Sequence, residues 1–392
     1  MPSASNRSAL FGIVGAVFVS STGIGSLLPV LPLYLRDRGA SYALVGAIVA
    51  SALVAQAIGQ WPAGRLAERL GRREMMVAGL LVAAAASVAF VLPLSVGWLL
   101  ALRFVQGLGF AAAIPAELAA VADVVPPDQL GRAYSWVAGA QQGGFIFGPA
   151  IGGLLAVFGR WTVFAVTGFA LFAAAIVVWQ ALPRSPRTVP ATNVKGPSLL
   201  GRTRLGAAVR AMALLSIGLG LLIGIYDVIW SLYMRGLGAG DPLIGLSFTL
   251  FALPLLIATP FAGWSSDRWD RRWLALGSIV LGSLMGPIYP FLKDIPVVLV
   301  VGAFEGALWA FTQPAMNAFL MDAVPERRAE AQGVVGSAQS AAMAVGSLVG
   351  GSMFAIGVAV PFIAATVAGV VFSVLAIPGL RAAGARFVSV RS

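Results

Sequence analysis

The chain has 392 residues, of which 59% are hydrophobic and only 10% are charged. Its mean hydropathy of +0.91 is too high for a water-soluble protein of this size, so we expect an all-α, polytopic membrane protein. The absence of cysteine and histidine excludes disulfides, thiol catalysis and histidine-borne proton transfer, so that any proton coupling falls to Asp or Glu.

Twelve apolar segments are long enough for a helix to cross a bilayer, which takes about 20 residues. We expect two pseudo-symmetric six-helix bundles, an N-terminal one over residues 1–182 and a C-terminal one with a short cytoplasmic tail over 211–392. Residues 183–210, with six cations and no acid, are the predicted cytoplasmic linker, and contact with anionic lipid is a second interpretation of them. The predicted spans are 9–35, 42–62, 75–94, 98–124, 132–158, 161–182, 211–234, 243–264, 273–291, 296–323, 329–356 and 361–379.

Basic residues are distributed unevenly between the two ends of these spans. If the N-terminus is cytoplasmic, 20 of the 26 Lys and Arg residues lie on the cytoplasmic side and five on the other side. The positive-inside rule therefore predicts two cytoplasmic termini, and this distribution accounts for the net charge of +11 without nucleic acid. We expect a multi-pass protein of the plasma (inner) membrane that contacts membrane lipids, binds no nucleic acid and is a monomer.

The chain repeats itself with an offset of 199 residues. Residues 64–73, GRLAERLGRR, correspond to residues 263–272, GWSSDRWDRR. An internal repeat in an apolar chain is typical of a two-halved membrane transporter, whose substrate site lies at the interface between the repeats. The same offset relates Pro115, Asp123 and Pro126 to Pro314, Asp322 and Pro325.

The loop after the second span resembles motif A of the major facilitator superfamily, and the resemblance extends to the 12-span drug–proton antiporter type. Glu68 stands where that motif usually has Asp, and in the second copy Asp270 replaces a glycine. The resemblance implies a charge latch on the cytoplasmic face that stabilises the outward-facing state, and the alternative is simple topogenic charge. The latch residues are Gly64, Glu68, Arg69, Gly71, Arg72, Arg73 and Asp123 in the first half and Gly263, Asp267, Arg268, Arg271, Arg272 and Asp322 in the second.

Two further segments resemble motifs of the same family. Residues 103–109, RFVQGLG, are similar to motif B, whose arginine the resemblance links to proton transfer. Residues 144–153 resemble motif C of drug–proton exchangers, and their glycines at i, i+4 and i+8 make one smooth helix face that another helix can approach closely. Ordinary glycine packing is the alternative. The motif C residues are Gly144, Gly148, Pro149, Gly152 and Gly153.

Four ionisable residues, Arg103, Glu117, Asp227 and Glu305, fall well inside predicted spans. Each costs roughly 2.5–3.5 kcal/mol at a span centre, so each must be paired, protonated or exposed to a water-filled cavity. By resemblance, their spans line that cavity. At 1.5 Å per residue all but Glu117 lie about 7–14 Å below the external end of their spans, so they are candidates for one pocket. Glu117, about 21 Å from Arg103 along the helix, is a candidate second protonation site or inner gate.

A buried carboxylate near one arginine can switch between a protonated and an arginine-paired state, which is the chemistry a proton exchanger needs. The alternative is a permanent bridge that only holds helices together. Several exporters of this type carry an acid in the first span, but here that span has no acid and offers polar residues such as Ser20, Ser21 and Thr22, so we expect the coupling site in the second half. Candidate substrate-cavity residues, for whose aromatic members packing or interfacial anchoring is the alternative, are Tyr34, Trp136, Gln141, Tyr226, Trp230, Trp309 and Gln339.

The resemblance implies a secondary active transporter, a proton-coupled antiporter that exports lipophilic, cationic or neutral small molecules by alternating access. The coupling ion is the proton, and we expect no other cofactor and no metal. A carrier of a sugar, metabolite or lipid on the same fold is the alternative, and a non-transporting receptor or scaffold is a remote one. No nucleotide-binding loop or nucleophile–base pair is present in the sequence, so we do not expect an enzyme.

Overall fold

The computed structural model describes residues 4–183, 206–324 and 328–391, and this part of the chain is helical with short turns and no strand. The predicted linker falls almost entirely on residues 184–205, outside the described residues, as does Pro325 of the repeat. The chain divides into two compact units: unit 1 is Met1–Thr192 with Ala239–Thr249, and unit 2 is Asn193–Gly238 with Leu250–Ser392.

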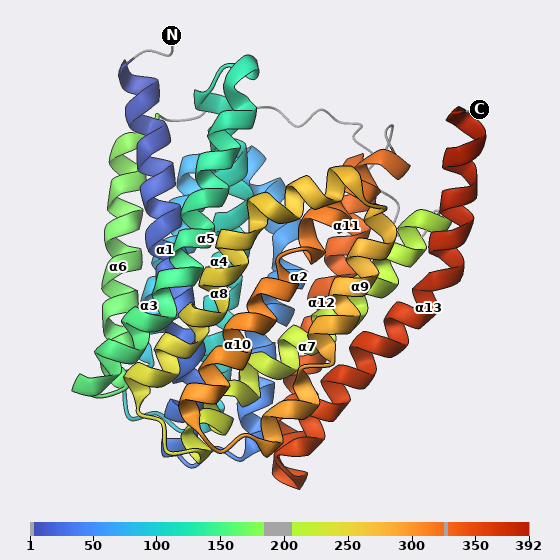
Figure 1. Ribbon diagram of the computed structural model, residues 1–392. Helices are drawn as coiled ribbons and strands as arrows, with labels where there is room; N and C mark the ends of the chain where they lie inside the picture. The colour runs from blue at the N-terminus through green and yellow to red at the C-terminus, as the bar shows by residue number, and fades with distance from the viewer. Residues whose placement is uncertain (1–3, 184–205, 325–327, 392) are drawn as a thin grey trace. The chain divides into compact units, whose positions relative to one another are not determined.

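Figure 1 labels most of the helices along the chain. Unit 1 contains α1 (Ala4–Asp37), α2 (Tyr42–Leu70), α3 (Arg72–Ala89), α4 (Val96–Val124), the 3₁₀ turn η1 (Pro127–Gln129), α5 (Leu130–Leu155), η2 (Ala156–Phe158), α6 (Trp161–Ala181) and the beginning of α8 (Asp241–Arg268). Unit 2 contains α7 (Ala207–Gly236), the rest of α8, α9 (Arg271–Ser283), η3 (Gly286–Phe291), α10 (Ile295–Trp309), α11 (Thr312–Ala323), α12 (Arg328–Ile356) and α13 (Ala359–Arg391).

Eleven segments in the described part of the chain are long and apolar enough to cross a membrane. The predicted span that is missing from these eleven is the third, residues 75–94, which corresponds to α3 and ends earlier than expected, at Ala89. Helix α3 has 18 residues, and its first turn contains Arg72, Arg73 and Glu74. The uncharged part of α3 is therefore too short to be recognised as a membrane span. The all-helical class is confirmed, while the count of twelve spans stays a prediction.

The predicted tenth span is not one helix, because α10 ends at Trp309 and α11 begins at Thr312. Pro314 has no N–H to donate to the carbonyl of Ala310, and its ring crowds that carbonyl, so the helix is weakest at this point. Pro115 occupies the corresponding position of α4, which is continuous. The proline therefore permits the break without dictating it.

Within each unit the helices pack through small residues. In unit 1, α1 packs along α5 and α6, α4 packs on α2 and α3, and α1 and α5 run side by side in Figure 1. In unit 2, α7 packs along α12 and α13. Small residues let helix backbones approach closely in a membrane, where no hydrophobic driving force brings helices together.

The two units use the same tyrosine contact at positions 199 residues apart. Tyr34 on α1 donates its hydroxyl proton to the carbonyl of Phe90, which follows α3. Tyr233 on α7 donates to the carbonyl of Tyr289 in η3 at 2.7 Å. In both units this bond ties the first helix of the repeat to the end of its third segment, so the repeat in the sequence is matched by a repeated contact.

Candidate functional site

Glu305 on α10 is a carboxylate buried inside unit 2, with 1% of the residue exposed. The phenolic hydroxyl of Tyr289 donates to Glu305 Oε2 at 2.5 Å. The indole N–H of Trp309, one helical turn further along α10, donates to Oε1 at 3.2 Å. Both carboxylate oxygens therefore accept from a neutral donor, and no cation in the described part of unit 2 forms an ion pair with them.

Aromatic rings from four further positions, one of them Tyr233 at a centroid distance of 6.2 Å, surround the Tyr289 ring. The Trp230 ring meets it edge-on with centroids 5.0 Å apart, and the Phe362 ring lies 5.5 Å away. Tyr226 stacks on Trp230 at 6.2 Å and meets Phe362 edge-on at 5.5 Å. Aromatic pairs in these geometries add packing energy beyond buried area, so the rings hold the Tyr289 hydroxyl in place against Glu305.

This arrangement gives Glu305 two alternative chemical states. An ionised carboxylate accepts both hydrogen bonds, whereas a protonated one becomes a donor through one oxygen. Loading a proton therefore adds a donor at Glu305 and weakens it as an acceptor for the bonds from Tyr289 and Trp309. A buried ionisable group in a membrane segment is a functional-site candidate by default, because an unpaired charge there is costly.

Asp227 lies on α7, one residue after Tyr226 and three residues before Trp230 in the sequence. It is half-buried, as is Tyr226, whereas Trp230 is buried. The structure thus brings Tyr226, Trp230, Trp309 and Glu305 into one cluster within unit 2, with Asp227 on the helix that carries two of the rings.

Arg103 of unit 1 takes part in a chain of side-chain hydrogen bonds. Its guanidinium donates to the amide oxygen of Gln106, one turn along α4. The Gln106 amide nitrogen donates to Ser87 Oγ at 2.6 Å, and Ser87 donates in turn to the carbonyl of Ala83 on α3 at 2.7 Å. Gln106 and Ser87 are buried, so this chain links the arginine of α4 to α3. Glu117 is half-buried on the same helix.

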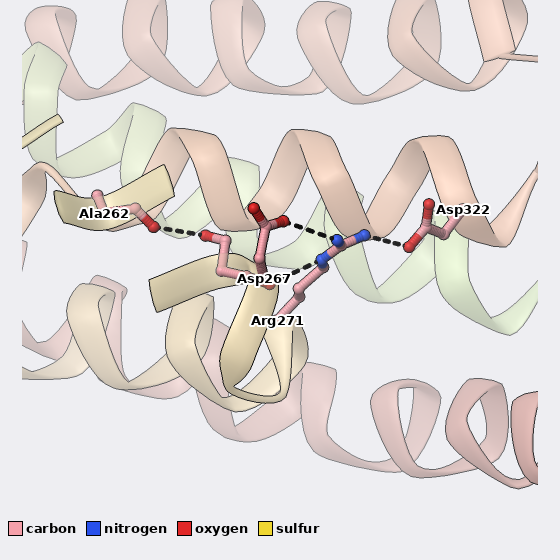
Figure 2. Close-up of polar contacts among 5 residues, drawn as sticks. Ala262, Asp267, Arg271 and Asp322 are labelled. Atoms are coloured by element: carbon pink, nitrogen blue, oxygen red, sulfur yellow. Dashed lines mark hydrogen bonds and ion pairs between the residues drawn. The ribbon is translucent and has the colours of Figure 1, made fainter. Parts of the chain in front are cut away.

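Figure 2 shows the second copy of the loop that resembles motif A. Arg271 at the start of α9 forms ion pairs with Asp322 of α11 and, at 3.2 Å, with Asp267 of α8, while its Nε donates to the carbonyl of Ser266 at 2.9 Å. One guanidinium therefore joins the ends of three helices. Gly263 has open space around it, and Arg268 lies over the ring of Trp264.

The first copy makes the corresponding ion pair, between Arg72 of α3 and Asp123 of α4. Glu68 is exposed and has no ion pair with a described residue, unlike Asp267 of the second copy. Arg73 donates to the carbonyl of Leu182 at 3.2 Å, and Arg272 donates to that of Leu380 at 3.0 Å. Among the other predicted latch residues, Gly64 has open space around it and Arg69 is exposed.

The two copies differ at the residue that joins the helices. Gly71 has φ +108°, a conformation that residues with a side chain rarely adopt, and a Cβ there would also strike the Glu74 carboxylate. Asp270 has φ −66° and caps α9, with its side chain accepting from the backbone N–H of Arg272 at 3.0 Å. The second copy therefore needs no glycine, which explains this departure from the motif.

The glycines that resemble motif C face α1. A Cβ on Gly144 would lie 2.6 Å from Ser21 Cβ, one on Gly148 would lie 2.6 Å from the Thr22 carbonyl oxygen, and one on Gly152 would strike the backbone of Ser26. Pro149 is buried beside the same seam.

Gly153 faces a different element, the beginning of α8. A Cβ on Gly153 would lie 3.0 Å from the Cα of Gly245. In the second half, Gly224 of α7 and Gly346 of α12 make the equivalent close seam between α7 and α12. Each unit thus pairs its first and fifth segments through glycine.

The remaining predicted cavity residues belong to both units. Tyr34 is buried and engaged with Phe90, and its ring lies 4.6 Å from that of Phe164. Trp136 and Gln141 are exposed on α5 of unit 1, and Gln339 is half-buried on α12 of unit 2. Their proposed contact with substrate stays a prediction.

Several residues of these clusters were not predicted. Tyr289 was not singled out in the sequence because a phenol carries no charge. Its position 199 residues after Phe90, which follows the offset of the repeat, could have indicated it. Arg160, between η2 and α6, pairs with Asp37 and, at 3.0 Å, with Asp241. Burial lowers the pKa of Arg160, but hydrogen bonds to the two carboxylates outweigh burial and raise that pKa above its ordinary value.

Comparisons with known proteins agree with this fold. The family model of the Major Facilitator Superfamily matches residues 13–226 and again 212–389. Multidrug resistance protein 2 of Bacillus subtilis (strain 168) is 24% identical over 360 residues, which cover 90% of each chain. Multidrug resistance protein 1 of the same organism is 28% identical over 362 residues, covering 90% of this chain and 91% of the relative. A crystal structure of a D-xylose–proton symporter superposes with a TM-score of 0.76 at 19% identity, covering 95% and 96% of the two chains.

Proposed function

The chain belongs to the Major Facilitator Superfamily and is an integral membrane transporter rather than an enzyme, and on this premise we propose that it is a proton-coupled antiporter. It exports lipophilic small molecules, cationic or neutral, by alternating access. Relatives named as multidrug resistance proteins, at 24% and 28% identity across nine-tenths of the chain, support export over uptake. The glycine seam of α5, which resembles the motif of drug–proton exchangers, supports the same direction.

The observation that carries the proposal is Glu305, buried and held by two neutral donors. A permanent bridge inside unit 2 needs a cation beside the carboxylate, and no cation in the described part of that unit forms an ion pair with Glu305. In our proposal Glu305 and Asp227 receive protons from outside. They release these protons to the cytoplasm when the substrate enters from that side, so that proton inflow drives export.

We further propose twelve spans in the plasma membrane, with α3 as the third span and with both termini in the cytoplasm. Because the chain has no cysteine, single cysteines can test this orientation directly. Asp128 and Asp294 are both exposed. The predicted topology puts Asp128 on the cytoplasmic side of the membrane and Asp294 on the external side. Cysteine at Asp294 should react with an impermeant maleimide on intact cells, and cysteine at Asp128 only after permeabilisation. The reverse pattern contradicts the orientation.

Transport by purified protein in liposomes that contain a pH-sensitive dye tests the function. We expect lipophilic cations to produce proton movement in the direction opposite to the substrate, and a liposome without protein to show none. The panel must also hold sugars and nucleosides, because the fold alone does not select the substrate. Proton movement together with a sugar, with no response to lipophilic compounds, would replace our proposal by a sugar symporter.

A further inference from the structure

A groove in unit 1 lies where α1 passes the start of α5, and none of the glycines of the α1–α5 seam lines it. It encloses about 330 Å³, within the range of roughly 300–1,000 Å³ that is usual for small-molecule sites. Leu10, Val125 and Ala133 form its apolar floor, and Phe11 and Trp136 line it with aromatic rings. The groove is therefore built to hold an apolar group.

The polar side of the groove is basic. Arg132 and Gln129 line it, and the Arg132 guanidinium lies 5.2 Å from the centroid of the Trp136 ring. No described carboxylate forms an ion pair with Arg132. The groove also adjoins the N-terminus of α5, whose dipole favours an anion. Charge complementarity thus selects a ligand with a negative head and an apolar tail, and disfavours the cations that we propose as substrates.

We propose that this groove binds one anionic phospholipid, with its phosphate at Arg132 and Gln129 and an acyl chain along Phe11 and Trp136. Phe11 is 59% exposed and Trp136 is 37% exposed, so both offer ring surface to such a chain. Basic pockets between membrane helices on the cytoplasmic side are suited to anionic lipid head groups. Which leaflet supplies the lipid depends on the proposed orientation. The binding site itself does not depend on transport.

The test measures lipid binding to purified, delipidated protein by native mass spectrometry, with phosphatidylglycerol and phosphatidylcholine of the same acyl chains. We expect the parent to prefer phosphatidylglycerol. Arg132→Gln should weaken that binding about fivefold, the effect of one basic residue at an anionic surface, and should leave phosphatidylcholine binding unchanged. Arg132→Lys should keep most of the preference.

Arg65 provides a matched control, because its guanidinium also lies over a tryptophan four residues away, the Trp61 ring at 3.9 Å, but lines no part of the groove. Arg65→Gln should bind phosphatidylglycerol as the parent does. Glycerophosphoglycerol, which has the head group without acyl chains, should not compete, since the apolar floor contributes to binding. Effective competition would assign the groove to a free phosphate ester and overturn the proposal.

A diazirine-labelled phosphatidylglycerol locates the site independently, since its crosslinks should map to the peptides that contain Phe11 and Trp136. Unchanged binding in Arg132→Gln, an equal loss in Arg65→Gln, or crosslinks elsewhere would each overturn the proposal. Displacement of the lipid by a transported cation would assign the groove to substrate instead. Because no proton gradient is used, a failure here is distinct from a failure of the proposed antiport.

Discussion

Gly148 of α5 lies against the backbone of α1, so that a Cβ at position 148 would stand 2.6 Å from the carbonyl oxygen of Thr22. Side-chain carbons do not approach a backbone oxygen so closely, and a helix backbone cannot move aside as a flexible side chain does. Any residue larger than glycine must therefore separate α1 from α5. The spacing of these two helices is set by the absence of a side chain at one position.

Gly148→Leu should consequently abolish transport, and Gly148→Ala should lower both transport and thermal stability. Overpacking of a well-packed core typically costs about 1–3 kcal/mol. Gly139→Leu is the matched control, since it lies on the same helix with nothing within 4 Å of its Cβ position. Export from proteoliposomes and elution on size exclusion measure the two effects. Parental export by Gly148→Leu would mean that the α1–α5 spacing is not needed for function.

The ion pairs Arg72–Asp123 and Arg271–Asp322 occupy equivalent positions in the two units. Both are partly exposed, so we expect a double-mutant cycle on Arg271→Gln and Asp322→Asn to give a coupling energy of only about 0.2–1 kcal/mol in unfolding. Transport should suffer more than stability if the pair is a latch. The swap Arg271→Asp with Asp322→Arg should restore part of the transport.

Lys293→Gln removes an exposed cation outside the latch and should have no effect on transport. Loss of stability in step with loss of transport, without rescue by the swap, would reduce the pair to a structural contact. Full transport by both single variants would leave only the topogenic interpretation of these arginines.

The sequence predicted these pairs better than it predicted the Glu305 cluster, and the reason is physical. Charged residues are rare in an apolar chain, so Asp123 and Asp322 stood out at the cytoplasmic ends of the predicted spans, where the resemblance assigned them to the latches with the loop arginines. Neutral donors such as Tyr289 and Gln106 are not conspicuous in the composition. Their role depends on where η3 and α4 place them, and that follows from packing rather than from periodicity.

We expect Asp270 to make the stability of the protein depend slightly on pH. Its pKa is lowered, chiefly by the side-chain hydrogen bond from Arg272, with burial acting in the opposite direction. A lowered folded-state pKa contributes stability that is present above the unfolded value of about 3.9 and is lost as pH falls through the folded value.

The parent should therefore lose stability relative to Asp270→Asn as pH falls below about 4, because Asn retains an N-cap oxygen but does not titrate. Melting temperatures of both proteins across this pH range measure the difference. The pair is partly exposed, so the effect should shrink at high salt. A constant difference between the two melting curves at all pH values would contradict the assignment.

The hydrogen bond from Tyr289 to Glu305 gives the sharpest test of coupling. Tyr289→Phe keeps the ring in its aromatic surroundings and removes only the donor, so it should shift the pH at which export is half-maximal. Tyr233→Phe is the matched control, because the Tyr233 hydroxyl donates to the carbonyl of Tyr289 and not to Glu305. It should leave that pH unchanged.

Glu305→Gln and Asp227→Asn each preserve shape and remove a titratable proton. A carboxylate that carries the coupling proton should lose export driven by a proton gradient when it is neutralised. Exchange of substrate down its own gradient should survive, because alternating access does not require the proton once the charge is gone. Dye-loaded proteoliposomes report both activities in the same preparation. If both variants export against a gradient with the parent's pH dependence, these acids are structural, and proton antiport must be abandoned or assigned to Glu117.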